Sequence, residues 1–212
     1  MPVPMLDLKA QYASIKDEID AAVADVFAAQ QFRGGPHSDA FESAMASAVG
    51  VPHAIGVASG TDALYLALKA LDLGPDDEII TTPFTFFATA GAIVNAGGKP
   101  IFADICPDTY AIDPQSVEAR ITDRTRAIMP VHLYGQCADM DTLGDIARRH
   151  RLPIIEDAAQ AIGAQYKGRC AGSMSLAAAF SFYPTKNLGA AGEGGMIVTA
   201  DADMAQRSRM LR

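Results

Sequence analysis

The chain has 212 residues, half of them apolar and a fifth charged, with a formal net charge of −8. This length can bury one sizeable core, so we expect a single large domain over 1–212. The acidic balance disfavours nucleic acids and anionic membranes as partners. No apolar run is long enough to span a bilayer, and the N-terminus lacks a signal-peptide pattern.

The cysteines fit neither a disulfide framework nor a zinc site, because Cys106, Cys137 and Cys170 lie far apart and are odd in number. We expect buried or half-buried thiols in a protein of the reducing cytoplasm.

The first fifty residues predict two helices. Apolar residues recur at every fourth position over 15–27, which is the spacing of one helical face. The segment 33–36 contains two glycines and a proline and breaks this helix. The apolar positions over 41–49 have the same spacing and indicate a second helix.

Beyond residue 50, short apolar runs alternate with helical stretches. This alternation predicts βαβ units, and hence an α/β fold with a mostly parallel sheet and helices on both faces. The strands are expected at 53–58, 78–81, 99–103, 127–131 and 153–156, and the helices at 61–71, 85–95 and 140–150.

Near the end of the chain the alternation of strand-like and helical segments stops. The runs 177–183 and 195–199 are joined by a glycine-rich stretch, so we expect them to pair directly with each other. A last helix is expected from Asp201, which is a plausible cap, to the final residue.

The turn at 58–62 joins an expected strand to an expected helix. It places Gly60, Thr61 and Asp62 at a helix N-terminus, where free N–H groups and the helix dipole favour an anion such as phosphate. An ordinary helix cap formed by Ser59 or Thr61 explains the same residues. The spacing does not match the dinucleotide-binding fingerprint.

The expected strand 153–156 ends in Glu156, and a second carboxylate, Asp157, follows it directly. In an open parallel sheet, ligands bind beyond the carboxyl ends of the strands, where Glu156 and Asp157 lie. An acid at this position can face a cationic ring nitrogen or a metal, or it can cap the following segment. The residues leave these alternatives open.

Lys186 lies between the aromatic residues of 180–183 and a glycine-rich segment. Lysines are normally solvated, but one in a poorly solvated pocket can lose its proton and attack carbonyl groups. An anion site, a strand-end acid and such a lysine together are what pyridoxal 5′-phosphate (PLP) requires. Its phosphate needs N–H donors, its ring nitrogen a carboxylate, and its aldehyde an amine.

Five segments in this order resemble the sugar aminotransferases of the DegT/DnrJ/EryC1/StrS family, which have the type I PLP fold. The resemblance runs from Leu6 to the last residue. The segments are SGTDAL at 59–64, TPFTFFAT at 82–89, PVHLYGQ at 130–136, EDAAQ at 156–160 and SFYPTKNL at 181–188.

The resemblance implies roles around the cofactor ring. Lys186 matches the lysine that forms the Schiff base, and Asp157 matches the partner of the pyridine nitrogen. Gln160 matches the residue near the ring hydroxyl. Phe86 matches the aromatic residue that stacks on the ring, with a core phenylalanine as the alternative. His132 lies near the site without an assigned role.

The resemblance also implies a phosphate site. Ser181 matches a phosphate-binding hydroxyl, although a hydroxyl bonded to the backbone would explain it too. Gly60, Thr61 and Asp62 match the phosphate-binding turn.

The function implied by the resemblance is PLP-dependent transamination, in which an amino acid donor, L-glutamate, gives its amine to a nucleotide-linked keto-sugar. The position of the ketone, C3 or C4, is left open. The resemblance further implies a homodimer whose active sites are shared between chains. Family members continue into a smaller C-terminal domain, so the sequence is expected to be a fragment of a longer protein.

Three alternatives remain. Sugar dehydratases of the family carry histidine in place of the lysine, so Lys186 disfavours that activity. Another type I PLP enzyme, such as a lyase, would have the same core chemistry. A non-catalytic fragment with the PLP fold is the third.

Overall fold

The computed structural model describes residues 3–212. The helices are α1 (Leu8–Ala29), α2 (Pro36–Val49), α3 (Gly60–Lys69), α4 (Ala88–Ala96), α5 (Pro114–Glu118), η1 (Leu133–Gly135), α6 (Met140–His150) and α7 (Ala202–Leu211). The strands are β1 (His53–Val57), β2 (Glu78–Thr81), β3 (Lys99–Phe102), β4 (Thr125–Ile128), β5 (Ile155–Asp157), β6 (Gln165–Tyr166), β7 (Arg169–Cys170), β8 (Ala177–Ser181) and β9 (Gly195–Thr199).

The main sheet consists of two groups of strands, ordered β1-β9-β8-β5 and β3-β2-β4. Single parallel bridges, Ile128 to Ile154 and Val131 to Asp157, join the segment around β4 to that around β5. β9 is antiparallel to both of its neighbours, while the pairs β5–β8, β2–β3 and β2–β4 are parallel. The predictions of a mostly parallel sheet and of direct pairing between β8 and β9 are confirmed.

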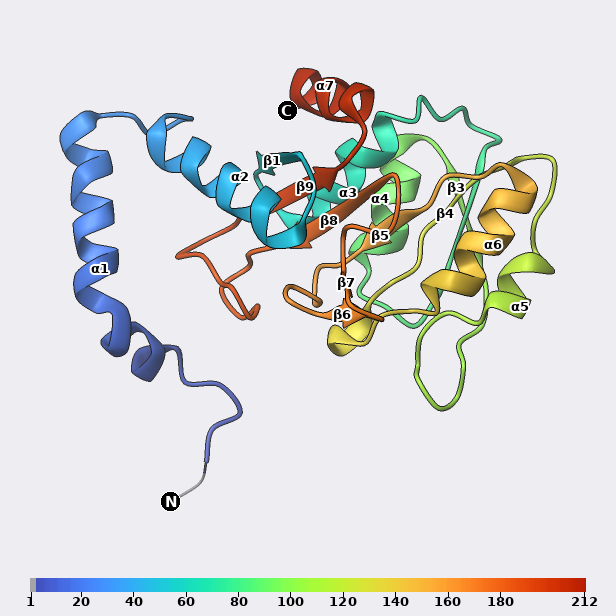
Figure 1. Ribbon diagram of the computed structural model, residues 1–212, viewed down its shortest axis with the longest axis horizontal. Helices are drawn as coiled ribbons and strands as arrows, with labels where there is room; N and C mark the ends of the chain where they lie inside the picture. The colour runs from blue at the N-terminus through green and yellow to red at the C-terminus, as the bar shows by residue number, and fades with distance from the viewer. Residues whose placement is uncertain (1–2) are drawn as a thin grey trace.

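Helices cover both faces of this sheet, as Figure 1 shows. Successive side chains of a strand point to opposite faces, and β8 illustrates the consequence. Ala177 and Ala179 belong to the core beneath α3, α4 and α7, whereas Ala178 and Phe180 belong to the core beneath α2. A third core packs α6 against β2 and β4 on the same side as α2.

The long helix α1 stands apart from the rest of the chain, at the left of Figure 1. It has no buried residue, and the large apolar side chains that recur at every fourth position over 15–27 are exposed. The predicted helix over 15–27 is confirmed, but it contributes nothing to the three cores.

The helix expected at 85–95 begins only at Ala88, which leaves Thr85 and Phe86 in the preceding loop. Asp201 caps α7 by accepting a hydrogen bond from the backbone N–H of Met204 at 2.7 Å. Cys137 is buried, and the other two cysteines are half-buried, as expected. Within residues 3–212, no helix combines the length and apolarity needed to cross a membrane.

Candidate active site

A cavity of about 490 Å³ lies where the carboxyl end of β5 meets the N-terminus of α3. Its lining contains seven of the eight residues predicted from the sequence: Gly60, Thr61, Phe86, Asp157, Gln160, Ser181 and Lys186. Asp62 is not part of the lining. It lies in the first turn of α3, where its backbone N–H donates to Ser59 Oγ at 3.0 Å.

A larger hollow of about 960 Å³ lies between α2 and the glycine-rich segment after Lys186. Its charged lining residues are Arg33, Asp39, Glu42 and Arg212, without a lysine or a fully buried carboxylate. The chemistry predicted from the sequence is therefore gathered in the smaller cavity.

One end of the cavity is suited to an anion. Ser59 caps α3, so the capping role considered from the sequence is real, yet Gly60 and Thr61 still present the helix N-terminus to the cavity. A Cβ atom added to Gly60 would lie 2.5 Å from Ser181 Cβ. Only glycine allows this close approach, which brings the helix N-terminus and the Ser181 hydroxyl together.

At the other end Asp157 is 5% exposed. Its Oδ2 accepts a hydrogen bond from Thr89 Oγ1 at 2.8 Å, and its Oδ1 accepts one from the backbone N–H of Ala159 at 3.2 Å. Burial raises the pKa of this carboxyl, although the two donors and the positive charge of Lys186 act in the opposite direction. A cationic group in the cavity would relieve the cost of this buried charge.

Lys186 lies in the loop after β8 and is half-buried. Burial lowers the pKa of its ammonium group, and the negative charge of Asp157 opposes this effect. The neutral amine is the form that reacts with carbonyl groups, so the cavity favours the reactive form.

Gln160 and Phe86 form part of the wall. Gln160 Oε1 accepts a hydrogen bond from the backbone N–H of Tyr134 at 2.9 Å, which fixes the orientation of its amide. Phe86 is 70% exposed, so the alternative of a core phenylalanine is wrong. Ser181 Oγ accepts only a long contact, 3.4 Å, from the backbone N–H of Tyr183.

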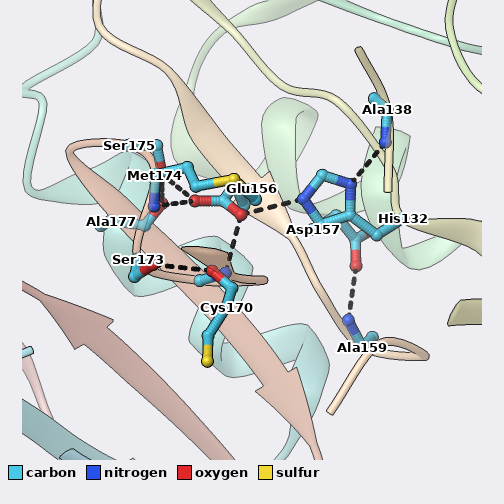
Figure 2. Close-up of polar contacts among 11 residues, drawn as sticks. His132, Ala138, Glu156, Asp157, Ala159, Cys170, Ser173, Met174, Ser175 and Ala177 are labelled. Carbon is cyan, nitrogen blue, oxygen red and sulfur yellow. Dashed lines mark hydrogen bonds and ion pairs between the residues drawn. The ribbon is translucent and has the colours of Figure 1, made fainter. Parts of the chain in front are cut away.

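Behind the cavity, on the opposite face of β5, Glu156 is fully buried (Figure 2). Its carboxylate accepts hydrogen bonds from His132 Nε2 at 2.9 Å, Gly172 N–H at 2.7 Å, Met174 N–H at 3.0 Å and Ser175 Oγ at 2.7 Å. Burial alone would raise the pKa of Glu156, but these donors, led by His132, bring it below its ordinary value.

The imidazole of His132 joins this network to the site. Its Nδ1 accepts the backbone N–H of Ala138 at 3.2 Å, so the ring proton is on Nε2 and is donated to Glu156. The backbone N–H of His132 donates to the carbonyl of Asp157 at 2.9 Å. His132 therefore holds the strand end from which Asp157 projects.

Residues 13–212 match the model of the DegT/DnrJ/EryC1/StrS aminotransferase family. The chain belongs to this family. The aminotransferases of the family depend on PLP, and the family and fold predicted from the sequence are confirmed.

About half of the residues are identical between this chain and several relatives. The chain is 49% identical to a UDP-N-acetyl-3-dehydro-α-D-glucosamine 3-aminotransferase of Acidithiobacillus ferrooxidans, over 99% of this chain and 57% of that protein. It is 52% identical to a pleiotropic regulatory protein of Geobacillus stearothermophilus, over 100% of this chain and 57% of that protein. The crystal structure of S. venezuelae DesV with a ketimine intermediate matches with a TM-score of 0.95 and 50% identity, over 99% of this chain and 57% of that one. The chain thus spans somewhat more than half the length of these relatives.

Two residues that contact the buried carboxylates, Thr89 and His132, have no role in the predictions from the sequence. Thr89 contacts Asp157, and in the sequence it is the last residue of the segment 82–89. His132 contacts Glu156, and in the sequence it belongs to the segment 130–136. The signal that could have found both is that each lies in a segment resembling the family.

Proposed function

We propose that this chain is the PLP-binding part of an aminotransferase that acts on nucleotide-linked keto-sugars. The observation that carries the proposal is that Lys186, Asp157 and the N-terminus of α3 line one cavity. These are an amine, a buried carboxylate and a set of backbone donors, contributed by three separate elements of the fold.

The donor set fits PLP. Gly60, Thr61 and Ser181 would hold the phosphate, and Asp157 would face the ring nitrogen. Phe86, which projects from the loop before α4, would cover one face of the ring, and Gln160 would face its hydroxyl. When bound, PLP supplies an aldehyde that takes up amino groups and a ring that withdraws electrons from the adjacent carbon.

Lys186 would move the proton of the substrate carbon. Lys186 Nζ is held in a cavity that lowers its proton affinity, so it can take a proton from the substrate carbon and return it to the product. Asp157 would keep the ring nitrogen protonated, because its buried negative charge strongly favours a cation beside it.

The substrates we propose are L-glutamate as amine donor and a 3-keto-sugar nucleotide as acceptor. The A. ferrooxidans relative supports the second assignment, since its name describes a 3-dehydro sugar. We further propose that the chain forms one large domain and acts in the cytoplasm as a homodimer that shares its active sites. The exposed aromatic side chains Phe86, Phe87 and Tyr134 near the cavity support a second chain there.

Borohydride trapping tests the cofactor site. After incubation with PLP and reduction, a pyridoxyl group should be found by peptide mass spectrometry on the peptide containing Lys186. Lys186→Ala should lose this label. The matched control is Lys167→Ala, which removes an exposed lysine paired with Asp141 at 2.6 Å and should leave the label intact. Label on another lysine, or none, would contradict the proposal.

The reaction itself is tested by the formation of 2-oxoglutarate from L-glutamate with a UDP-linked 3-keto-sugar. A chain that binds PLP but releases pyruvate or ammonia from amino acids would instead support a lyase. Binding without turnover in the native-length protein would support a non-catalytic role. Light scattering at micromolar concentration tests the dimer, and a fully active monomer would contradict it.

A further inference from the structure

A pair of threonine hydroxyls lies beside Asp157 in the wall of the cavity. Thr89 is in the first turn of α4 and is completely buried, and its Oγ1 donates to Asp157 Oδ2 at 2.8 Å. Thr85, in the loop before α4, has its Oγ1 2.7 Å from Thr89 Oγ1. Thr85 and Thr89 both line the cavity together with Asp157, so the two hydroxyls form the part of the wall beside the acid.

The direction of these hydrogen bonds follows from their chemistry. A hydroxyl has one proton to donate, and an ionised carboxylate only accepts. Thr89 therefore gives its proton to Asp157 and must accept the proton of Thr85. Polarised in this order, the two hydroxyls favour the negative charge on Asp157 more than a single hydroxyl would.

Thr89 is the side-chain donor that faces Asp157 from α4. The ionisable groups around this acid come from other segments: Tyr183, Lys186 and Glu193 line the cavity, His132 lies in the loop after β4, and Glu156 points to the opposite face of β5. The segment from Phe86 to Ala96 contains no ionisable residue. Among residues 3–212, the one other donor to this carboxylate is the Ala159 N–H, at a longer 3.2 Å.

We propose that Thr89, supported by Thr85, is a positioning residue that keeps the Asp157 carboxylate ionised and turned toward the cavity. The same hydrogen bond ties this acid to the segment that carries Phe86. The inference concerns Asp157 in the unliganded chain, and only its consequence for the cofactor ring rests on the proposed function.

Carboxyl ¹³C NMR of the unliganded chain, labelled at aspartate, tests the proposal directly. Thr89→Val keeps the shape and removes the donor, so the acid dissociation constant of Asp157 should fall by about tenfold, the size of one hydrogen bond to a charged oxygen. Thr89→Ser should restore it. Thr81→Val is the matched control, because Thr81 is equally buried but donates to the carbonyl of Met129 at 2.8 Å.

An unchanged Asp157 titration in Thr89→Val would overturn the proposal, as would an equal change in Thr81→Val. If Thr89→Val does not fold, Thr85→Val takes its place. It removes the second hydroxyl at a half-buried position and should shift the titration in the same direction by a smaller amount. An unchanged titration in Thr85→Val would then overturn the proposal.

A second measurement uses pyridoxamine 5′-phosphate labelled with ¹⁵N in the ring. Loss of the Thr89 donor makes Asp157 more basic, so the ring nitrogen signal should move toward that of neutral pyridine in Thr89→Val and return in Thr89→Ser. If the unmodified chain does not bind this probe, the proposed function fails, while the carboxyl titration still decides the role of Thr89. Binding with an unchanged ring signal in Thr89→Val would overturn the role toward the cofactor.

Discussion

Replacing Glu156 with glutamine is expected to destabilise the folded chain, because the buried carboxylate accepts four hydrogen bonds and an amide cannot. Oε1 accepts from Met174 N–H and Ser175 Oγ, and Oε2 accepts from His132 Nε2 and Gly172 N–H. Glutamine has one oxygen, so its NH₂ group must face one of these two pairs of donors.

One of the two orientations of the glutamine amide costs less free energy than the other. With NH₂ on the Oε1 side, the Ser175 hydroxyl can turn to the carbonyl of Ala177, already 2.9 Å away, and accept from the amide. Only Met174 N–H is then left without a partner. On the other side Gly172 N–H is orphaned, and His132 cannot change its tautomer because Nδ1 already accepts from the backbone.

An orphaned buried N–H costs about 1–3 kcal/mol, and each of the other bonds loses about 0.5–1 kcal/mol when the acceptor is no longer charged. Removing a buried charge offsets part of this loss. The free energy of unfolding of Glu156→Gln should therefore fall by about 2–4 kcal/mol.

Urea unfolding followed by circular dichroism measures this change. The control is Glu118→Gln, whose carboxylate is 45% exposed and pairs with Arg149, so its stability should match the unmodified chain within error. A loss below about 1 kcal/mol in Glu156→Gln would refute the reasoning, because it would mean that the donors around Glu156 find other partners.

Three other predictions follow from the same geometry. Asp157→Asn should still bind PLP but lose turnover by on the order of a thousandfold in steady-state assays, the scale of one preorganised electrostatic contact; near-normal kcat would make Asp157 a simple cap. Gly60→Ala should weaken the binding of pyridoxamine 5′-phosphate at least about tenfold in a fluorescence titration, because the added Cβ would clash with Ser181. The control is Gly144→Ala in α6, where the added Cβ meets open space. This variant should bind normally and gain about 0.5–1 kcal/mol in stability. The pKa of Glu156 is lowered in the folded state, so its contribution to stability is complete above the ordinary glutamate pKa of about 4.3 and is lost as the pH falls through the folded-state pKa. Urea unfolding between pH 7 and 3 should therefore show a smaller decrease in the free energy of unfolding for Glu156→Gln than for the unmodified chain. Equal decreases in the two proteins would contradict the lowered pKa.

Much of the chemistry could be read from the sequence. Local signals singled out Lys186, Asp157 at a strand end and the helix start at Gly60, because each signal depends on residues a few positions away, while the roles predicted for them came from the resemblance to the family. Even the separation of Glu156 from Asp157 onto opposite faces follows from the alternation of a strand. These local signals, together with five matching segments, determined the family.

The tertiary structure decided which partners these groups have. Thr89 is 68 residues from Asp157 in sequence, and His132 is 24 residues from Glu156, so no local pattern assigns either hydrogen bond. Asp62 shares the turn of Gly60 yet does not line the cavity. The physical reason is that propensity and periodicity act over one or two turns of chain, whereas the donors around a buried carboxylate are selected by how α4, β5 and the loop after β4 pack against one another.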